Sequence, residues 1–557
     1  MTPGVEFGDN AMGIGLRWSA PASMRWAGLS FGVAMLVCAS ASAIPFRSFD
    51  GTGNNFANPD FGMAGSLLLR LVAPDYGDGF STPAGAGRPS PRVISNGVVA
   101  QASSEFNKKG ASDFIWQWGQ FVDHDLDLVP TNPAEPFPIP VPPDDPAFAP
   151  ATELAFSRSV GVADANGVRQ QPNSLTAWID GSMVYGSSQA RADSLRSFQG
   201  GRLATSTDDL LPLDGTGLFR AGDDRVNEQV ALTAMHTLFM REHNRIADGL
   251  TADGGLDPVA DDEIVFQTAR AIVGAEIQSI TFNEFLPMVL GTSLGTQAYD
   301  DTIDPGVSNE FAGAAFRMGH TLLSSILLRL EENGGVIADG NLALRDAFFA
   351  PDEIIDNGID SILRGLAAQP AQEIDSMIVD DVRNFLFGPP GAGGLDLASL
   401  NLQRGRDHGL PSFNAVRIAL GLGAAEFGMG FFEPEADLAL QAVYGDINDV
   451  DLWIGAISEA HVPGAMVGIV AFTIIADQFM RARDGDRFWY ETMFGGAMLD
   501  ALNNTRLSDI ILRNTGIQTI QANVFEAVPR VPEPATLALL GAGMLAAAYF
   551  RRRRARS

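Results

Sequence analysis

Apolar residues recur every three or four positions in eight stretches of the chain, and this pattern predicts a mainly helical protein. Such spacing gathers the apolar side chains on one face of a helix, where they can be buried. No internal repeat is visible. The predicted helices cover residues 112–128, 223–247, 262–280, 311–330, 372–387, 412–425, 465–482 and 486–502.

Turn-forming residues dominate much of the remaining chain. Residues 44–110 are rich in Gly, Pro, Asn and Ser, and residues 130–150 are dense in proline. Because proline lacks a backbone N–H and breaks helices, both stretches are predicted to be irregular, with 130–150 a loop. The expected fold class is mainly α: a single large helical domain, residues 44–530, with long irregular loops and little β-structure.

Residues 1–43 have the pattern of a secretory signal peptide. Arg17 and Arg25 precede an apolar run that ends at Cys38, and small residues follow up to Ala43. This order predicts export, with cleavage after Ala43. The alternative is a buried helix.

Residues 531–557 combine three features in order. A Pro-Glu-Pro triplet at 532–534 precedes an apolar run, Ala535–Phe550, and four consecutive arginines begin at Arg551. A helix of that length spans ~24 Å, near the short limit for crossing a membrane. The arginines are expected on the cytoplasmic side, which places the body of the protein outside and agrees with a signal peptide.

Composition narrows the chemistry further. The 557 residues are 46% hydrophobic and carry a net charge of −30. Residues 1–43 are neutral and residues 531–557 carry +4, so the part between them carries −34. An acidic body repels nucleic acid and anionic lipid, so no nucleic-acid partner is expected. The only cysteine, Cys38, lies in the predicted signal peptide, which leaves no disulfide, thiolate or cysteine metal ligand. Imidazole chemistry is left to six histidines: His124, His236, His243, His320, His408 and His461.

The stretch Trp116–Asp125 carries the densest candidate chemistry. On a helix, Gln120 and His124 lie one turn apart, and Asp123 and Asp125 flank the histidine. Aromatic neighbours favour partial burial, and an imidazole with a pKa near ~6.5 can shuttle protons. A helix end with a hydrogen-bonded histidine is the alternative.

Oxygen-bearing side chains alternate in the segment 176–182. Thr176, Asp180 and Ser182 can converge on one hard cation, with the Trp178 carbonyl between them. Calcium takes roughly six to eight oxygen ligands, and one more carboxylate, from Asp123 or Asp125, would help complete the shell. A helix N-terminal cap fits the same residues.

Arg225 opens the predicted helix 223–247, with Glu228 and Gln229 on the same face. A cation is poorly placed there, because the helix dipole favours anions at its N-terminus, so Arg225 is expected to serve another purpose. His236 and His243 lack the spacing of zinc proteases and are predicted to be structural.

Two polar groups later in the chain stand in apolar surroundings. Gly319 leaves open space beside His320, which suits close approach of a flat ligand, although a core histidine is the alternative. Asn401 begins a polar cluster, residues 401–408, and its amide can hold a ring nitrogen of an imidazole.

Together these motifs resemble the animal haem peroxidase family over roughly residues 46–525. The resemblance is carried by residues 118–125, 176–187, 221–228, 241–245, 316–320 and 401–408. Residues 531–557 resemble the PEP-CTERM sorting signal of Gram-negative bacteria. That likeness implies an exosortase-type processing enzyme, transient membrane anchoring, and a final place at the cell surface or in the extracellular matrix.

The resemblance implies a role for each candidate residue. His320 corresponds to the proximal ligand of haem iron, and Asn401 to the acceptor of a hydrogen bond from its other ring nitrogen. His124 corresponds to the distal base, with Gln120 and Arg225 beside it.

The implied cofactors are haem b and calcium. Asp123 and Glu228 match carboxylates that family members esterify to haem methyl groups. The residues that match the calcium loop are Asp125, Thr176, Trp178 (through its carbonyl), Asp180 and Ser182.

The implied activity is oxidation of a small reductant by hydrogen peroxide through a ferryl intermediate. Gln229 stands where the myeloperoxidase branch has a methionine, which favours bromide, iodide, thiocyanate or phenols over chloride. A fatty-acid dioxygenase of the cyclooxygenase branch is an alternative, but it needs a tyrosine where this chain has Arg317. The other alternative, a non-catalytic matrix or adhesion protein, has no need of both His124 and His320.

Overall fold

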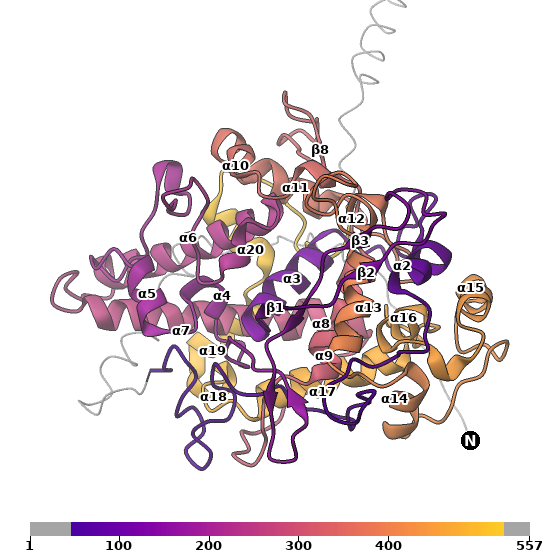
Figure 1. The fold of residues 1–557 in the computed structure, drawn as a ribbon. Coiled ribbons are helices and arrows are strands. Elements are labelled where there is room, and N and C mark those ends of the chain that lie inside the picture. The colour runs from indigo at the N-terminus through magenta and orange to yellow at the C-terminus, as the bar shows by residue number, and fades with distance from the viewer. Residues whose placement is uncertain (1–45, 529–557) are drawn as a thin grey trace, which may run out of the picture.

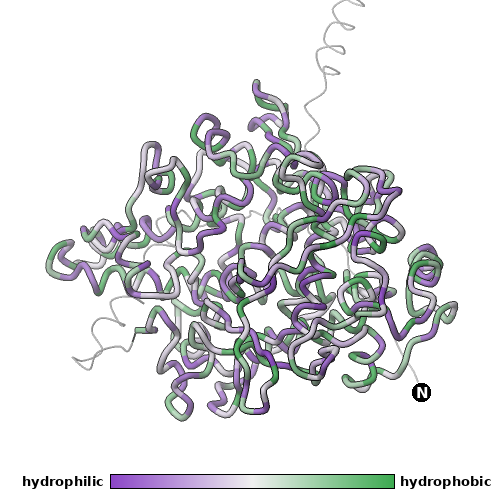
Figure 2. The backbone as a smooth tube through the Cα atoms, viewed as in Figure 1, coloured by the Kyte–Doolittle hydropathy of each residue, from purple (hydrophilic) through white to green (hydrophobic). Residues whose placement is uncertain are grey.

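The computed structural model describes residues 46–528, and helices dominate them, as the sequence pattern predicted (Figure 1). The predicted signal peptide and sorting segment lie outside the described residues. Within residues 46–528, no helix is both long enough and apolar enough to cross a membrane. Hydrophobic and hydrophilic positions interleave along residues 46–528, as expected when most helices bury one side (Figure 2).

The α-helices have the following bounds: α2 Pro91–Ile94, α3 Phe114–Leu126, α4 Ser182–Tyr185, α5 Gln189–Leu195, α6 Val230–Ala252, α7 Asp262–Ile280, α8 Leu286–Leu290, α9 Asn309–Gly313, α10 Pro351–Asn357, α11 Asp360–Ala368, α12 Asp380–Arg383, α13 Leu397–Asp407, α14 Phe413–Ala419, α15 Pro434–Tyr444, α16 Leu452–Ser458, α17 Ile469–Asp484, α18 Tyr490–Met493, α19 Gly496–Asn504 and α20 Leu507–Asn514.

The strands form only short antiparallel pairs in the described residues. They are β1 (Thr131–Pro136) with β4 (Ser157–Ser159), β2 (Ile139–Pro140) with β3 (Glu153–Leu154), β5 (Val162–Ala163) with β6 (Arg169–Gln170), and β7 (Ile326–Leu327) with β8 (Leu342–Ala343). The expectation of little β-structure is confirmed. The prediction that residues 130–150 form only loop is wrong in part, because β1 and β2 lie there.

Helix α3 is anchored in the middle of the molecule by aromatic packing (Figure 1). Phe121 stacks on Phe239 of α6 with ring centroids 5.1 Å apart, and Trp118 lies 5.7 Å from the same ring. Each such aromatic pair contributes about 0.5–1.5 kcal/mol beyond its buried area. This packing holds one face of α3 and fixes where its polar face points.

Some predicted helices are present with small changes. Helix α3 lies inside 112–128, α7 matches 262–280, and α17 is shifted slightly from 465–482. The helix predicted at 223–247 begins only at Val230, because Gln229 caps it by accepting a hydrogen bond from the Ala231 N–H at 2.6 Å. Arg225 therefore precedes the helix.

The long helix predicted at 311–330 is wrong. Ala314 adopts non-helical angles (φ −144°, ψ −69°) and separates α9 from a 3-10 turn, η5 (Ala315–His320). Beyond it the backbone pairs with distant segments, such as the Leu322 carbonyl with the Gln372 N–H at 3.1 Å. Tertiary hydrogen bonds have replaced helical ones there.

Three other predicted helices are shorter than expected. Residues 372–387 contain only α12, because the Glu373 and Ile378 N–H groups bond to distant carbonyls. Helix α14 stops before residue 425, near Gly421 with its φ of +76°. Residues 486–502 divide into α18 and α19.

Candidate active site

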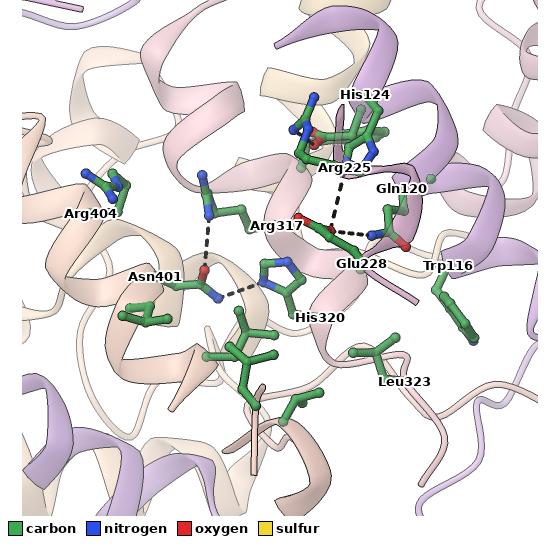
Figure 3. Close-up of a pocket in the computed structure, with 18 of the residues that line it drawn as sticks. Trp116, Gln120, His124, Arg225, Glu228, Arg317, His320, Leu323, Asn401 and Arg404 are labelled. Atoms are coloured by element: carbon green, nitrogen blue, oxygen red, sulfur yellow. Dashed lines mark hydrogen bonds and ion pairs between the residues drawn. The ribbon is translucent and has the colours of Figure 1, made fainter. Parts of the chain in front are cut away.

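A cavity of about 380 Å³ opens between α3, the turn before α6, the turn η5 and α13. Its volume falls in the range of cofactor and small-molecule sites, roughly 300–1,000 Å³. The residues that line it include His124, Gln120, Arg225, His320 and Asn401 (Figure 3). The fold thus brings together side chains that lie in four separate parts of the sequence.

Helix α3 supplies His124 and Gln120 to this cavity. The opposite side of the helix is held by Trp118 and Phe121, which are fully buried. Gln120 and His124 lie one helical turn apart, so both project from the side that is left. His124 is 3% exposed, which keeps its ring away from bulk water.

Arg225 lies in a 3-10 turn, η3 (Asp224–Asn227), immediately before α6. Asp223 caps this turn by accepting from the Arg225 backbone N–H at 2.7 Å, and it also binds the guanidinium through Nε at 2.9 Å and Nη2 at 2.8 Å. Nη2 donates in addition to the Asp127 carbonyl at 3.0 Å. The guanidinium is therefore held from two sides.

The pair of Asp223 and Arg225 stays charged. Burial works against both charges, but the neighbouring Arg225 lowers the pKa of Asp223. In the same way, Asp223 raises the pKa of Arg225 despite burial. A fixed positive charge consequently lies at the cavity wall beside His124.

Two carboxylates face the same space. Gln120 Nε2 donates to Glu228 Oε2 at 2.9 Å, and His124 Nε2 lies 3.8 Å from that oxygen. Asp123 Oδ2 lies 4.0 Å from Arg225 Nη1. The Asp123 and Glu228 side chains are 32% and 30% exposed, so both can meet a ligand in the cavity.

His320 ends η5 on another wall of the cavity (Figure 3). Its Nδ1 lies 2.8 Å from the amide nitrogen of Asn401, and the amide oxygen accepts from Arg317 Nη1 at 3.2 Å. The resemblance implied the reverse, an amide oxygen facing the ring; a half-turn of the amide exchanges the two atoms. In both orientations Asn401 fixes the ring, while Nε2 points toward the Glu228 side (Figure 3).

Both imidazoles are neutral at neutral pH. Burial, together with Arg225, lowers the pKa of His124 well below its ordinary value, and Asp223 only partly opposes this. Burial and Arg317 lower the pKa of His320 to about 3, against the effect of Asn401. A neutral ring keeps one nitrogen lone pair, which can take a proton or bind a metal.

The segment 176–182 wraps around Asp125. The Asp125 carboxylate accepts from the N–H groups of Asp180 and Gly181, each at 3.0 Å, and from the N–H and hydroxyl of Ser182 at 2.5 and 2.7 Å. Thr176 Oγ1 donates to Asp180 Oδ2 at 3.2 Å. Among the described residues, no group of three or more His, Cys, Asp and Glu could hold a metal ion.

This donor set fits calcium in kind, because it offers only oxygen atoms. Burial and Asp180 raise the pKa of Asp125 to about 8, so a nearby cation would stabilise its charged form. A carboxylate has about four acceptor positions, and protein donors already take four at Asp125. A bound cation must therefore displace some of these hydrogen bonds.

An aromatic rim at the cavity has no periodic pattern in the sequence that would reveal it. Phe348 and Phe387 line the cavity, and the Phe387 ring lies 5.4 Å from Phe348 and 5.3 Å from Phe349. Phe349 and Phe387 have φ of +50° and +64° and are 51% and 43% exposed. Such angles are rare for bulky residues and cluster at functional sites.

Arg317 and Arg404 also line the cavity. Arg404 lies in the polar cluster 401–408, which was the only signal for it in the sequence. Arg317 donates through Nε to the Ala312 carbonyl at 2.7 Å, in addition to its bond to Asn401. These two arginines add positive charge beside His320.

Comparison with known proteins gives a consistent result. The family model described as animal haem peroxidase matches residues 46–525, and the PEP-CTERM protein-sorting motif matches residues 530–554. Eosinophil peroxidase of Homo sapiens is 37% identical, with 86% of this chain and 76% of the relative covered.

Two solved structures share the fold. Peroxidase A from Dictyostelium discoideum is 33% identical with a TM-score of 0.80, covering 87% of this chain and 100% of that one. A fatty acid alpha-dioxygenase from Arabidopsis thaliana has a TM-score of 0.76 at 22% identity, covering 88% and 84%. The second likeness concerns the fold alone.

Proposed function

The chain belongs to the animal haem peroxidase family, and we propose that it is an exported peroxidase that uses hydrogen peroxide to oxidise small anions or phenols. One observation carries the proposal: His124, Arg225 and His320 line a single cavity, with the first two adjacent and the third on a different wall. A peroxidase needs the distal pair, His124 and Arg225, on one face of its cofactor and the iron ligand, His320, on the other.

The residues present fit haem b. His320 has Nδ1 paired with Asn401, which leaves Nε2 to bind iron. At Gly319 an added Cβ would meet open space, so a flat ring can approach closely there. Arg317 and Arg404 offer two cations to the two carboxylates of a porphyrin. When bound, the haem supplies the iron centre that exchanges electrons with peroxide and donor.

His124 and Arg225 act on peroxide. His124 Nε2 takes a proton from one peroxide oxygen and returns it to the departing one, as base and then acid. Arg225 stabilises the negative charge that develops along the O–O bond, a contribution of about 3 kcal/mol for one donor. Gln120, fixed by its bond to Glu228, orients the incoming molecule.

We assign Asp123 and Glu228 as the carboxylates that form esters with haem methyl groups. This assignment is supported by their partial exposure to the cavity on the same side as His124. Such an ester would replace a methyl C–H bond by a C–O bond, a two-electron oxidation for which hydrogen peroxide would be the oxidant, with the hydrogens leaving as protons. Burial raises the pKa of both carboxyl groups. Calcium bound by Asp125, Thr176, Trp178, Asp180 and Ser182 would hold the end of α3 that carries His124.

The donors proposed are bromide, iodide, thiocyanate and phenols. Positive charge from Arg225 favours entry of small anions. The exposed rings of Phe349 and Phe387 offer a stacking surface to a phenol at the rim. The sorting motif supports export from a Gram-negative cell, exosortase-type processing, transient anchoring, and a final place at the surface or in the matrix.

The dioxygenase alternative is weaker. Its chemistry needs a tyrosine near the iron, and no tyrosine is among the described residues that line the cavity. Arg317 occupies the corresponding position and bonds to Asn401. A purely structural role is also weaker, since it gives no reason for a charged, half-buried arginine beside His124 at the cavity.

The test is spectroscopy and turnover on purified residues 44–530 loaded with haem. We expect a Soret band that shifts on addition of peroxide, and steady-state oxidation of iodide, thiocyanate and phenols. Consumption of oxygen with a fatty acid would support the dioxygenase instead. Failure to bind haem would favour the structural alternative.

A further inference from the structure

His124 and His236 have ring nitrogens that are poorly satisfied within the described residues. Nδ1 of His124 is buried without a hydrogen-bond partner, and the His236 ring, which is 1% exposed, has at most a weak hydrogen bond to the Met183 backbone. Leaving a buried polar group unpaired costs roughly 1–3 kcal/mol. Such a concentration at one place calls for an explanation.

The two rings lie on neighbouring helices that pack closely. The His236 ring on α6 meets the Phe121 ring on α3 edge-on, with centroids 5.1 Å apart. Phe121 precedes His124 by three residues, so His236 and His124 share the interface between α3 and α6. The contrast with His243, two turns further along α6, is sharp: its nitrogens pair with Tyr185 Oη at 2.9 Å and the Gly201 carbonyl at 2.8 Å.

Asp223 connects the same place to Arg225. Its Oδ1 lies 3.9 Å from His124 Nδ1, too far for a direct hydrogen bond. The Asp223 N–H donates to the Met183 carbonyl at 3.0 Å, and the Met183 backbone is also the one weak hydrogen-bond partner of the His236 ring in the described residues. Arg225 takes three acceptor positions of the Asp223 carboxylate, which leaves one of about four available.

A single water satisfies this arrangement. Buried waters make about three hydrogen bonds to otherwise unpaired polar groups. Here the water accepts from the His124 Nδ1–H, donates to the Asp223 carboxylate, and bonds one nitrogen of His236. A separate cavity of about 10 Å³ is lined by His236, and its volume is close to the minimum that holds one water, roughly 10–15 Å³. A second water there can hydrogen-bond the other ring nitrogen of His236.

We propose that a buried water joins His124 Nδ1, Asp223 and His236, and that His236 is thereby a positioning residue that fixes the His124 tautomer. A proton held at Nδ1 leaves the lone pair on Nε2, the nitrogen 3.8 Å from Glu228 on the cavity side. Asp223 then orients two groups: the guanidinium of Arg225 by direct hydrogen bonds, and the ring of His124 through the water. The kinetic consequence rests on the proposed function, whereas the water itself does not.

The kinetic test compares the haem-loaded native chain with His236→Leu and His236→Gln by stopped flow. Leucine cannot bond the water, and we expect the rates of cyanide binding and of reaction with peroxide to fall about 10-fold or more, with the KM for iodide unchanged. Glutamine keeps polar atoms and should restore part of the rate. His236→Leu should unfold close to the native temperature, because His236 makes at most one weak hydrogen bond to the protein, through the Met183 backbone.

His243→Leu is the matched control. It removes two protein hydrogen bonds from the same helix, so the unfolding temperature should fall while the cyanide rate stays native. Native rates in His236→Leu would overturn the proposal. A native chain that binds haem but does not react with peroxide would refute the proposed function; the buried water is then tested by the structure below.

The structural test needs no activity. A high-resolution crystal structure of residues 44–530 should show a water within hydrogen-bond distance of both His124 Nδ1 and His236, and nitrogen NMR should place the His124 proton on Nδ1. The proposal is overturned if no water bridges the two rings or if the proton is on Nε2. This measurement also decides the matter if His236→Leu does not fold.

Discussion

His320 and Asn401 are joined by a contact of 2.8 Å between ring Nδ1 and amide Nδ2, and Arg317 holds the other end of the same amide. Iron binding through Nε2 requires a proton on Nδ1 and therefore an acceptor facing it. Asn401→Asp supplies an acceptor that also pairs with Arg317. We expect it to lower the reduction potential of the haem iron, measured by spectroelectrochemistry, whereas Asn401→Leu weakens haem retention.

His124→Ala should leave haem bound, because the proposed iron ligand is His320 and not His124. The rate of reaction with peroxide should fall by roughly 10²–10⁴-fold, the usual contribution of a general acid–base group. His461→Ala is the control, since the His461 ring lies 2.7 Å from the Ile374 carbonyl and is not among the described residues that line the cavity. An unchanged stopped-flow rate for His124→Ala refutes the assignment of the base.

Phe387→Ala tests the aromatic rim. We expect the KM for phenols to rise roughly 2- to 10-fold, as loss of an aromatic contact of about 0.5–1.5 kcal/mol implies, with the KM for iodide unchanged. Phe198→Ala is the matched control, because Phe198 has a similar φ of +55° and is 55% exposed but does not line the cavity. Equal effects of the two substitutions on phenol KM would remove the rim from substrate binding.

Chelation tests the calcium assignment. A ligand present at about 100 times its dissociation constant stabilises the folded state by about 2.7 kcal/mol, so chelation should lower the unfolding temperature and calcium should restore it. Asp125→Asn should abolish this response. If chelation changes nothing and metal analysis finds no calcium, the Asp125 network is complete with protein donors alone.

Glu242 makes stability depend on acid. Burial would raise its pKa, but Arg513 and Arg245 lower it to about 2. Because an unfolded glutamate titrates near ~4.3, this stability is present above that pH and is lost as pH falls toward 2. We expect Glu242→Gln to cost about 3 kcal/mol at pH 7, since it removes the buried negative charge that pairs with the half-buried Arg245 and Arg513, and to cost progressively less below pH 4 in urea unfolding.

Part of the fold was predictable because local patterns and tertiary packing agree. Helices α3 and α7 carry long periodic runs, and both are present near their predicted bounds. The segment 311–330 has an equally apolar sequence but is buried on many sides, and its backbone bonds to distant strands and loops instead. The spacing of apolar residues cannot distinguish a true helix from such a segment, because it reflects which side chains are buried and not which backbone hydrogen bonds form.

The cavity was predictable from motifs where side-chain chemistry is unusual for its surroundings. Arg225 was singled out by a misplaced charge and His320 by the open space at Gly319, and both line the cavity. Asp223 and the phenylalanine rim were not, since a cap and a rim depend on turns that only the folded chain specifies. The orientation of the Asn401 amide likewise depends on Arg317, a neighbour brought in by the fold.

The most direct measurement is a crystal structure of residues 44–530 loaded with haem. We predict that His320 Nε2 binds the iron and that His124 and Arg225 lie over the opposite face of the same ring. Haem bound elsewhere, iron held by another residue, or His124 and His320 on one face would contradict the account.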